Sequence, residues 1–257
     1  MKIVIIGAGN VGGHLARRFE ESGVDVLQVL TRHWDRHLAL TKQLQAQFIT
    51  SFDDLETEAD AYILAVNDSS ITEVAEKISR RVKHKLIAHT SGATASTVLE
   101  PFSDRYGILY PLQTFSEIRA QDWENLPVCV DANNADDLAL LHRLALYLSP
   151  KVYEITDEQR SILHVAATFV NNFGNYLFQI AEQIVVAEDI PFQLLKPLIV
   201  ETAAKVQQHS PEEMQTGPAR RGDTHTIKRH LEYLEKYPDF RQLYETMTAL
   251  IQKKYTN

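Results

Sequence analysis

The chain of 257 residues is long enough for one large domain or two smaller ones, and its composition, 44% hydrophobic and 23% charged, is that of an ordinary globular protein. A net charge of −8, without long runs of Lys or Arg, argues against a nucleic-acid partner or an anionic membrane surface. Cys129 is the single cysteine, which excludes an internal disulfide. The sequence shows neither a secretory signal nor a membrane span, and this predicts a reduced, cytoplasmic protein.

Short apolar runs alternate with amphipathic segments in the first part of the chain. Runs such as Lys2–Ile6 and Ala61–Val66 are continuously apolar, as in strands that are covered on both faces. The segments between them have helical spacing, so the pattern predicts a parallel sheet flanked by helices. Further strands are expected at Asp25–Leu30, Lys85–His89, Ile108–Tyr110, Pro127–Asp131 and Lys151–Ile155, and helices at Val11–Ser22, Ser69–Arg80 and Asp136–Leu148.

Strand signals stop near residue 155. A capping box from Thr156 to Gln159 opens a long helical pattern that can run to about Glu188. Further helical patterns cover Phe192–Gln208, Thr224–Lys236 and Phe240–Lys253. We therefore expect two domains, an α/β domain with a doubly wound parallel sheet at residues 1–155 and an all-α domain at residues 156–257.

The first strand leads into a turn with the G-x-G-x-x-G spacing of dinucleotide-binding proteins. Gly7 permits the tight turn, Gly9 lets the backbone approach a pyrophosphate, and Gly12 allows the helix to pack closely on the strand. The helix that begins here offers unpaired amides and a partial positive charge. The residues expected to bind the pyrophosphate of a nicotinamide cofactor are Gly7, Ala8, Gly9, Asn10, Val11 and Gly12.

The end of the second strand predicts NADP rather than NAD. NAD sites usually carry an acidic residue here, which holds the ribose 2′-hydroxyl and would repel a 2′-phosphate. Thr31 and Arg32 can instead hydrogen-bond and neutralise the phosphate, with His33 and Arg36 close by. The alternative is that Arg32 lies only in a surface loop. His33 and His37 are four residues apart, but no carboxylate or thiol completes a metal site, so no metal is expected.

Ligands of open α/β sheets bind beyond the carboxyl ends of the strands. The residues that follow the expected strands are therefore candidates, although each of them can equally belong to an ordinary connecting loop or a helix cap. Near the cofactor we expect Ala65, Val66, Asn67, Thr90, Ser91 and Gly92. The sequence YPLQTFS, which follows the sixth strand, is a candidate substrate wall that contains Tyr110, Gln113 and Thr114.

The long helix carries a stripe of polar residues. On an α-helical wheel these residues fall within an arc of about 100°. They are His164, Thr168, Asn171, Asn172, Asn175 and Gln179, and no charged residue joins them before Glu182. Solvated faces usually carry Lys, Glu and Arg, so short neutral side chains favour a shielded ligand pocket. A polar helix–helix contact is the alternative.

Several motifs together resemble a bacterial family of Rossmann-like NADP oxidoreductases whose second domain is of unknown function. They are the glycine turn, Thr31-Arg32, HTSGA, YPLQTFS, LHVAATFVNNF and the sequence TGPARRGD at 216–223. The wider group includes pyrroline-5-carboxylate reductase and 6-phosphogluconate dehydrogenase. This resemblance implies a second domain like the C-terminal domain of 6-phosphogluconate dehydrogenase, which is helical and often dimerises, so a homodimer is expected. It also implies that the long helix supplies groups to a small-molecule substrate.

Some hydroxyacid dehydrogenases of that group use a lysine on this helix as the acid/base, but this chain has none between Lys151 and Lys196. His164 is therefore the candidate proton donor, with Asn171 and Asn172 in the catalytic site. The expected substrate contacts are Gln113, Thr114, Thr168, Asn175, Arg220, Arg221 and Asp223. Arg220 and Arg221, expected in an irregular loop between Gly217-Pro218 and the next helix, can clamp an anion, or Asp223 can simply cap that helix.

The sequence thus predicts an NADP-dependent oxidoreductase that transfers hydride between nicotinamide and a carbonyl or imine carbon of a small, anionic metabolite. Two alternatives stay open. One is a dehydrogenase of the prephenate or arogenate type, which releases carbon dioxide as it forms NADPH. The other is a non-catalytic NADP-binding sensor or scaffold.

Overall fold

The computed structural model describes residues 1–32, 38–116 and 120–255. His33, Arg36 and His37, which the sequence analysis considered for phosphate or metal binding, lie outside the described residues. The chain divides into two compact units, Met1–Asn171 and Asn172–Asn257. This division falls later than residue 155, where the strand signals end, because the beginning of the long helix packs with the sheet.

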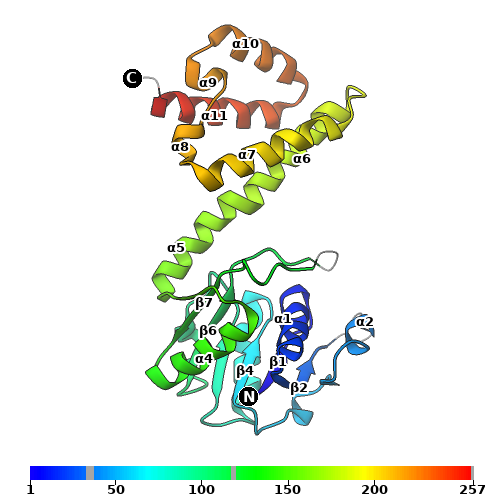
Figure 1. The fold of residues 1–257 in the computed structure, drawn as a ribbon, viewed down its shortest axis with the longest axis vertical. Coiled ribbons are helices and arrows are strands. Elements are labelled where there is room, and N and C mark those ends of the chain that lie inside the picture. The colour runs from blue at the N-terminus through cyan, green and yellow to red at the C-terminus, as the bar shows by residue number, and fades with distance from the viewer. Residues whose placement is uncertain (33–37, 117–119, 256–257) are drawn as a thin grey trace. The chain divides into compact units, whose positions relative to one another are not determined.

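The first unit is built on an eight-stranded sheet, which the described residues form in the order β3-β2-β1-β4-β5-β6-β7-β8 (Figure 1). Its strands are β1 (Lys2–Ile6), β2 (Asp25–Leu30), β3 (Gln47–Ile49), β4 (Ala61–Leu64), β5 (Leu86–His89), β6 (Tyr106–Pro111), β7 (Val128–Ala132) and β8 (Val152–Glu154). Its helices are α1 (Asn10–Glu21), α2 (Leu38–Thr41), α3 (Ile71–Ser79), α4 (Ala135–Leu148) and α5 (Asp157–Ala167).

The two faces of the sheet carry separate apolar cores. Ile3 and Ile5 of β1 belong to the cluster that includes buried residues of α1 and α4. Val4 and Ile6 alternate with them and belong to the cluster that includes buried residues of α3. Because consecutive strand residues point to opposite faces, a fully apolar strand needs helices on both sides. The expected doubly wound α/β fold is confirmed.

The sheet departs from the expected pattern at β7 and at β3. β7 runs antiparallel to β6, whereas the sequence favoured a parallel sheet. A parallel pair needs a crossover connection, usually a helix, and the described residues between β6 and β7 form none. Strand β3 was absent from the expected strands; it has three residues, of which only Ile49 is buried.

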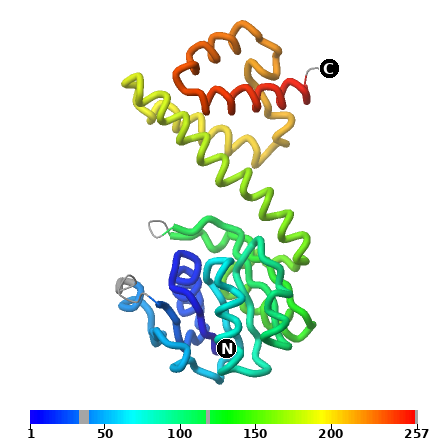
Figure 2. The backbone as a smooth tube through the Cα atoms, turned by 180° about the vertical axis from the view of Figure 1, so that it is seen from behind, coloured from blue at the N-terminus to red at the C-terminus, as the bar shows by residue number. Residues whose placement is uncertain are grey.

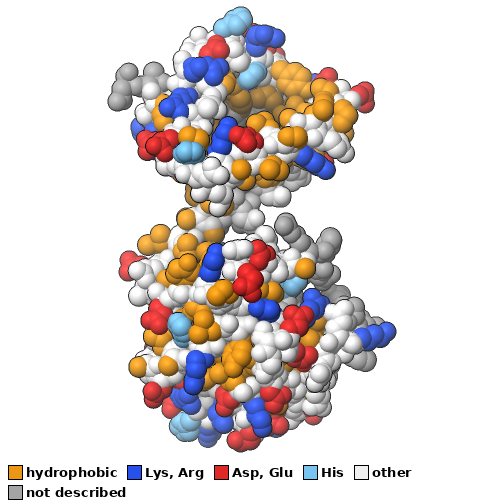
Figure 3. All heavy atoms as spheres, in the orientation of Figure 1, with side chains coloured by type: hydrophobic (Ala, Val, Ile, Leu, Met, Phe, Trp, Pro, Cys, Tyr) orange, Lys and Arg blue, Asp and Glu red, His pale blue; other side chains and the backbone are white. Residues whose placement is uncertain are grey.

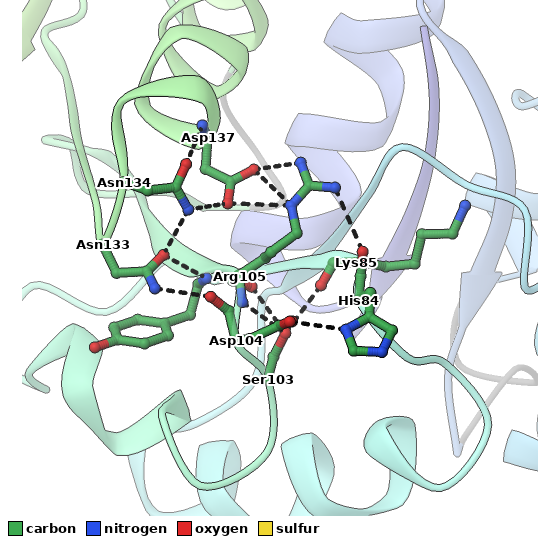
Figure 4. A network of polar contacts seen from close by, with 9 residues as sticks. His84, Lys85, Ser103, Asp104, Arg105, Asn133, Asn134 and Asp137 are labelled. Atoms are coloured by element: carbon green, nitrogen blue, oxygen red, sulfur yellow. Dashed lines mark hydrogen bonds and ion pairs between the residues drawn. The ribbon is translucent and has the colours of Figure 1, made fainter.

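A polar network stabilises the edge of the sheet where β5 and β6 begin (Figure 4). The Arg105 guanidinium donates from Nε and Nη2 to the carboxylate of Asp137, and the shortest of these distances is 2.5 Å. The Asp137 side chain is fully buried, and Asn134, the N-cap of α4, donates to it over 2.6 Å. The hydrogen bond from Arg105 to Asp137 raises the pKa of the guanidinium. This network therefore attaches the start of α4 to the sheet.

The second unit is helical, as expected (Figure 2). It contains α6 (Gly174–Val186), α7 (Lys196–Gln208), α8 (Pro211–Met214), α9 (Pro218–Arg221), α10 (Thr224–Tyr233) and α11 (Pro238–Tyr255).

The predicted capping box is present at the start of α5, since Thr156 accepts from the Gln159 amide and the Gln159 side chain accepts from the Thr156 amide. Between α5 and α6, residues Thr168–Phe173 form a π-helical segment. Among the described residues, none of the helices is long and apolar enough to cross a membrane.

Candidate cofactor and active site

The glycine turn between β1 and α1 has the geometry that a bound pyrophosphate requires. Gly7 has a φ of 107°, and a Cβ there would lie 2.2 Å from the carbonyl oxygen of Ala65. A Cβ on Gly12 would lie 1.9 Å from the carbonyl oxygen of Gly7. A Cβ on Gly9 would instead have no neighbour within 4 Å. Gly7 and Gly12 thus make the turn and the close packing possible, whereas Gly9 leaves open space in front of the backbone.

The N-terminus of α1 faces this space. Gly9 is the N-cap and contributes no side-chain cap to the first amides of the helix. These amides are therefore available to an anion, and the helix dipole favours negative charge there. The Asn10 side chain is turned away to donate to the Phe115 carbonyl over 3.1 Å.

A pocket of about 210 Å³ continues from the glycine turn to the end of β2. Three of the residues that line it are charged: Arg32, Glu73 and Lys77. Thr31 also lines it, and its side chain is buried. The expected cofactor residues found at this pocket are Gly7, Ala8, Gly9, Thr31, Arg32, Ala65, Val66 and Asn67. A cation and a hydroxyl beside an open glycine turn fit the ribose phosphate of NADP.

The loop after β5 forms a rigid turn around a buried histidine. His89 accepts from the Ser91 amide at Nδ1 over 3.1 Å, and its Nε2 lies 3.3 Å from the Ala95 carbonyl oxygen. This arrangement assigns the proton of the neutral ring to Nε2. Burial lowers the pKa of His89 to about 4. The Ser91 hydroxyl accepts from the amides of Ala93 and Thr94, and these contacts stabilise the loop.

This loop brings Gly92 against the two side chains that form the centre of the candidate site. The Tyr110 hydroxyl lies 3.3 Å from Nδ1 of His164. A Cβ on Gly92 would lie 2.4 Å from the same nitrogen and 2.8 Å from Cζ of Tyr110. Only glycine allows the Tyr110–His164 contact at this place. Burial raises the pKa of Tyr110, so the phenol stays neutral and acts as a hydrogen-bond partner.

Helix α5 is attached to the loop after β5 through Asp157 and Arg160, which lie before His164 on the same helix. Arg160 is 1% exposed, and its Nη1 donates to Asp157 over 2.6 Å. Its Nη2 donates to the Thr94 carbonyl. Asp157 in turn accepts from both the amide and the hydroxyl of Ser96. Because α5 is fastened to the loop after β5, the position of His164 relative to Gly92 is fixed.

The polar stripe does not have the geometry of a continuous α-helix. Residues 168–173 form a π-helical segment, which changes the angular spacing that the wheel assumed. The Thr168 hydroxyl donates to the His164 carbonyl over 3.1 Å, while Asn171, Asn172 and Asn175 are exposed. Apolar side chains of the same segment are also exposed, Phe169 at 66% and Val170 at 83%. π-Helical turns often mark functional positions, and this one follows His164 directly.

Two of the expected substrate residues of the second unit, Arg220 and Asp223, have partners within that unit. Arg220 and Arg221 belong to α9, which begins at Pro218 after the N-cap Gly217, so the predicted irregular loop is wrong. Arg220 donates to the carbonyl groups of Glu213 and Gln215 and lies over the Tyr255 ring. Asp223 caps α10 by accepting from Thr226, as in the alternative reading of the sequence.

Gln113 and Thr114 of the loop after β6 are exposed, and the Gln113 side chain accepts from the Thr114 amide. The loop is attached to α1 from two places. Asn10 reaches the carbonyl of Phe115, and His14 lies 3.0 Å from that of Ser116. The sequence YPLQTFS thus lies beside the glycine turn, at the edge where it was expected.

Two family models match the chain. Residues 2–91 match the family described as NADP oxidoreductase, coenzyme F420-dependent, and residues 126–251 match a domain of unknown function. The crystal structure of a "putative NADP oxidoreductase" from Bacteroides fragilis is 35% identical, with 98% of each chain covered and a TM-score of 0.92. The chain belongs to this family of NADP oxidoreductases.

More distant structures share the fold of this oxidoreductase. An imine reductase from Myxococcus stipitatus in complex with NADP+ is 17% identical with a TM-score of 0.66, over 98% of this chain and 93% of the other. A Plasmodium falciparum pyrroline carboxylate reductase with NADP bound is 14% identical with a TM-score of 0.63, over 99% and 97%. The search of curated proteins found no match. NADP is the cofactor of the family, and the glycine turn and the Arg32 pocket fit it.

The sequence did not reveal the roles of Tyr110 and Arg160 around His164 in the candidate site. Tyr110 was seen only as a member of the substrate wall, because its contact with His164 joins residues 54 positions apart. Arg160 follows the capping box by one position and was not among the expected site residues. Its spacing of four from His164 was the available signal, since such residues share a helix face.

Proposed function

We propose that this oxidoreductase reduces a carbonyl or imine carbon of a small metabolite and that His164 delivers the proton. The observation that carries this proposal is the contact of Tyr110 with Nδ1 of His164 beside Gly92. A histidine is the side chain best suited to proton transfer near neutral pH. Its position after the carboxyl ends of β5 and β6 is where open α/β sheets bind their ligands.

In the proposed reaction, His164 and Tyr110 have different roles. NADPH, when bound, supplies the hydride that reduces the electrophilic carbon. His164 donates a proton to the oxygen or nitrogen that becomes negative as the carbon is reduced. Nδ1 of His164 donates to the Tyr110 hydroxyl both in the protonated ring and in the neutral ring that remains after the transfer, so the tyrosine orients the ring in both states. The proton that is transferred therefore comes from Nε2.

The remaining substrate contacts stay predictions from the sequence. Asn171, Asn172, Asn175 and Thr168 would orient the substrate, and Gln113 and Thr114 would line its site. The prediction that the substrate is an anion rests on Arg220 and Arg221, which were expected to bind it together with Asp223. Of these, Arg221 is the stronger candidate, because Arg220 donates to two backbone carbonyls of its own unit.

A panel of small 2-oxo acids and cyclic imines, followed by NADPH absorbance, tests the function. We expect oxidation of NADPH with at least one compound, and a loss of turnover of about 10²–10⁴ in His164→Ala. NADPH affinity should stay within about twofold. Unchanged turnover in the variant would remove His164 from the mechanism. Formation of NADPH with release of carbon dioxide would favour the prephenate-type alternative, and no reaction with any compound would favour the sensor.

We also propose that the protein is a homodimer through its second unit. Large apolar side chains of α6, of α7 and of the turn before α7 are between 41% and 68% exposed: Tyr176, Leu177, Phe178, Leu194, Leu198 and Val200. Hydrophobic side chains gather on the visible face of this unit in Figure 3. Monomeric proteins rarely expose so many large apolar side chains close together, and a second copy of the chain would cover them.

A further inference from the structure

The pocket that holds Arg32 has a second charged wall, contributed by α3. Glu73 and Lys77 stand one turn apart on this helix, and both line the pocket. Lys77 Nζ lies 2.6 Å from Glu73 Oε1 and 5.6 Å from the ring centre of Phe52, which also lines the pocket. The ion pair is thus part of the same cavity as Thr31 and Arg32.

Glu73 is ionised and is influenced by both cations. The hydrogen bond from Lys77 is the main cause that lowers its pKa, and the charge of Arg32 adds to this effect. Both side chains of the pair remain solvent-accessible, Lys77 at 44% and Glu73 at 60%. An exposed ion pair of this kind contributes little to the stability of the fold. Lys77 can therefore leave Glu73 for another anion at a small cost in free energy.

The charge balance of the pocket has a direct consequence for NADP. Among the described lining residues, Arg32 and Lys77 are the cations and Glu73 is the anion. The Glu73 carboxylate repels a 2′-phosphate. It also forms an ion pair with the Lys77 ammonium group, which would otherwise attract the phosphate. A pocket that contained Arg32 and Lys77 alone would bind the phosphate more strongly.

We propose that Lys77 is a second cation for the 2′-phosphate of NADP, alongside Arg32, and that Glu73 holds Lys77 and limits the affinity for NADP. Binding of the phosphate moves the Lys77 ammonium from the carboxylate to the phosphate oxygens. The pair therefore determines how strongly the enzyme prefers NADP to NAD. This inference concerns the cofactor site alone and does not depend on the chemistry assigned to His164.

Fluorescence titration of the purified full-length protein with NADPH and with NADH tests the proposal. We expect Lys77→Gln to weaken NADPH binding by about tenfold, since one charge-assisted contact is lost. Glu73→Gln should strengthen NADPH binding by about threefold, because the repulsion ends and the ammonium is released. NADH binding should stay within about twofold in both variants. Both effects should decline as the salt concentration rises.

The opposite signs distinguish a binding role from a structural one. If the ion pair only supported the helix, the two variants would change NADPH and NADH affinity in the same direction. That result, or an equal effect on both cofactors, would overturn the proposal. Glu76 of α3 and Arg80, the C-cap of this helix, provide a matched control, because they form a 2.6 Å pair with the same sequence spacing but do not line the pocket. Arg80→Gln and Glu76→Gln should leave both affinities unchanged, and thermal melting confirms that each variant is folded.

Discussion

The phenol oxygen of Tyr110 lies 3.3 Å from Nδ1 of His164, although the two residues are 54 positions apart in the chain. Strand β6 supplies one and helix α5 the other. The contact exists because Gly92 has no side chain between them and because Asp157 and Arg160 fasten α5 to the loop after β5. A sequence pattern alone does not reveal the contacts that hold the proposed proton donor, His164, in one orientation.

The first prediction concerns this pair. Tyr110→Phe removes the hydroxyl but keeps the ring, so the imidazole of His164 loses its orientation while the core stays filled. We expect kcat to fall by about tenfold, the value of roughly one hydrogen bond, and the NADPH dissociation constant to stay unchanged. Steady-state kinetics and NADPH titration measure the two quantities separately. Tyr106→Phe, at the other end of β6, is the control and should leave kcat unaffected. A kcat for Tyr110→Phe equal to that of the unaltered enzyme would show that the contact has no catalytic role.

A second prediction separates the glycines of the cofactor turn. Gly9→Ala should fold normally, because its Cβ would meet nothing within 4 Å, but the methyl group would occupy the space in front of the turn. NADPH affinity should fall by at least about tenfold. Gly12→Ala places a Cβ 1.9 Å from a backbone oxygen and should lower the free energy of unfolding by about 3 kcal/mol. Urea denaturation and NADPH titration provide the comparison. Equal stability of the two variants would contradict the assigned roles.

The buried His89 predicts a loss of stability in acid. Burial lowers its pKa from 6.5 to about 4 in the folded protein. Between these two values the unfolded chain binds a proton that the folded chain does not, so the free energy of unfolding decreases as the pH falls. From pH 7 to pH 5 we expect His89 to account for about 2 kcal/mol of this decrease.

Urea denaturation at each pH, compared with His89→Asn, measures this contribution. The asparagine keeps an acceptor for the Ser91 amide but does not titrate. The variant should be less stable at pH 7, with a flatter pH dependence. Parallel pH curves for the two proteins would mean that His89 is not the titrating group.

The network at the start of β6 predicts a stability effect without an effect on cofactor binding. Arg105→Met leaves the fully buried carboxylate of Asp137 without its cation, and we expect a loss of about 3 kcal/mol in the free energy of unfolding. Arg80→Met breaks an exposed pair and should cost less than about 1 kcal/mol. Denaturant unfolding of both variants gives the difference. Similar losses in the two variants would contradict the importance assigned to burial.

The sequence could predict the elements whose signals are local. The glycine turn, the continuously apolar β1 and β4, and the capping box at Thr156 are each contained in a few neighbouring residues, and the structure contains all of them. Strand β3 gave no such signal, since it is three residues long with one buried side chain. The π-helical segment at Thr168–Phe173 was equally hidden, because α-helical spacing was assumed throughout.

The site was predicted less completely than the fold. Arg32 and the glycines follow from their places at the ends of strands, where open sheets bind cofactors. The Asp157–Ser96 contact joins residues 61 positions apart, and Arg160 is buried only because that contact brings α5 onto the sheet unit. Such partners depend on packing at long sequence separation. For this reason the sequence could propose His164 as a proton donor but could not name the residues that hold it in position.

The last prediction concerns the proposed homodimer. Leu198, near the start of α7, is 63% exposed, and Leu194, four residues earlier in the short helical turn before α7, is 68% exposed. Leu198→Asp should convert a dimer to a monomer without unfolding it, because a charge at an exposed position is costly only when a partner covers it. Sedimentation velocity measures the oligomeric state, and thermal melting reports the folding of the variant. Leu250→Asp on α11, where the side chain is 59% exposed, should leave the dimer intact. A monomeric unaltered protein, or a Leu198→Asp variant that remains dimeric, would exclude α7 as the contact surface.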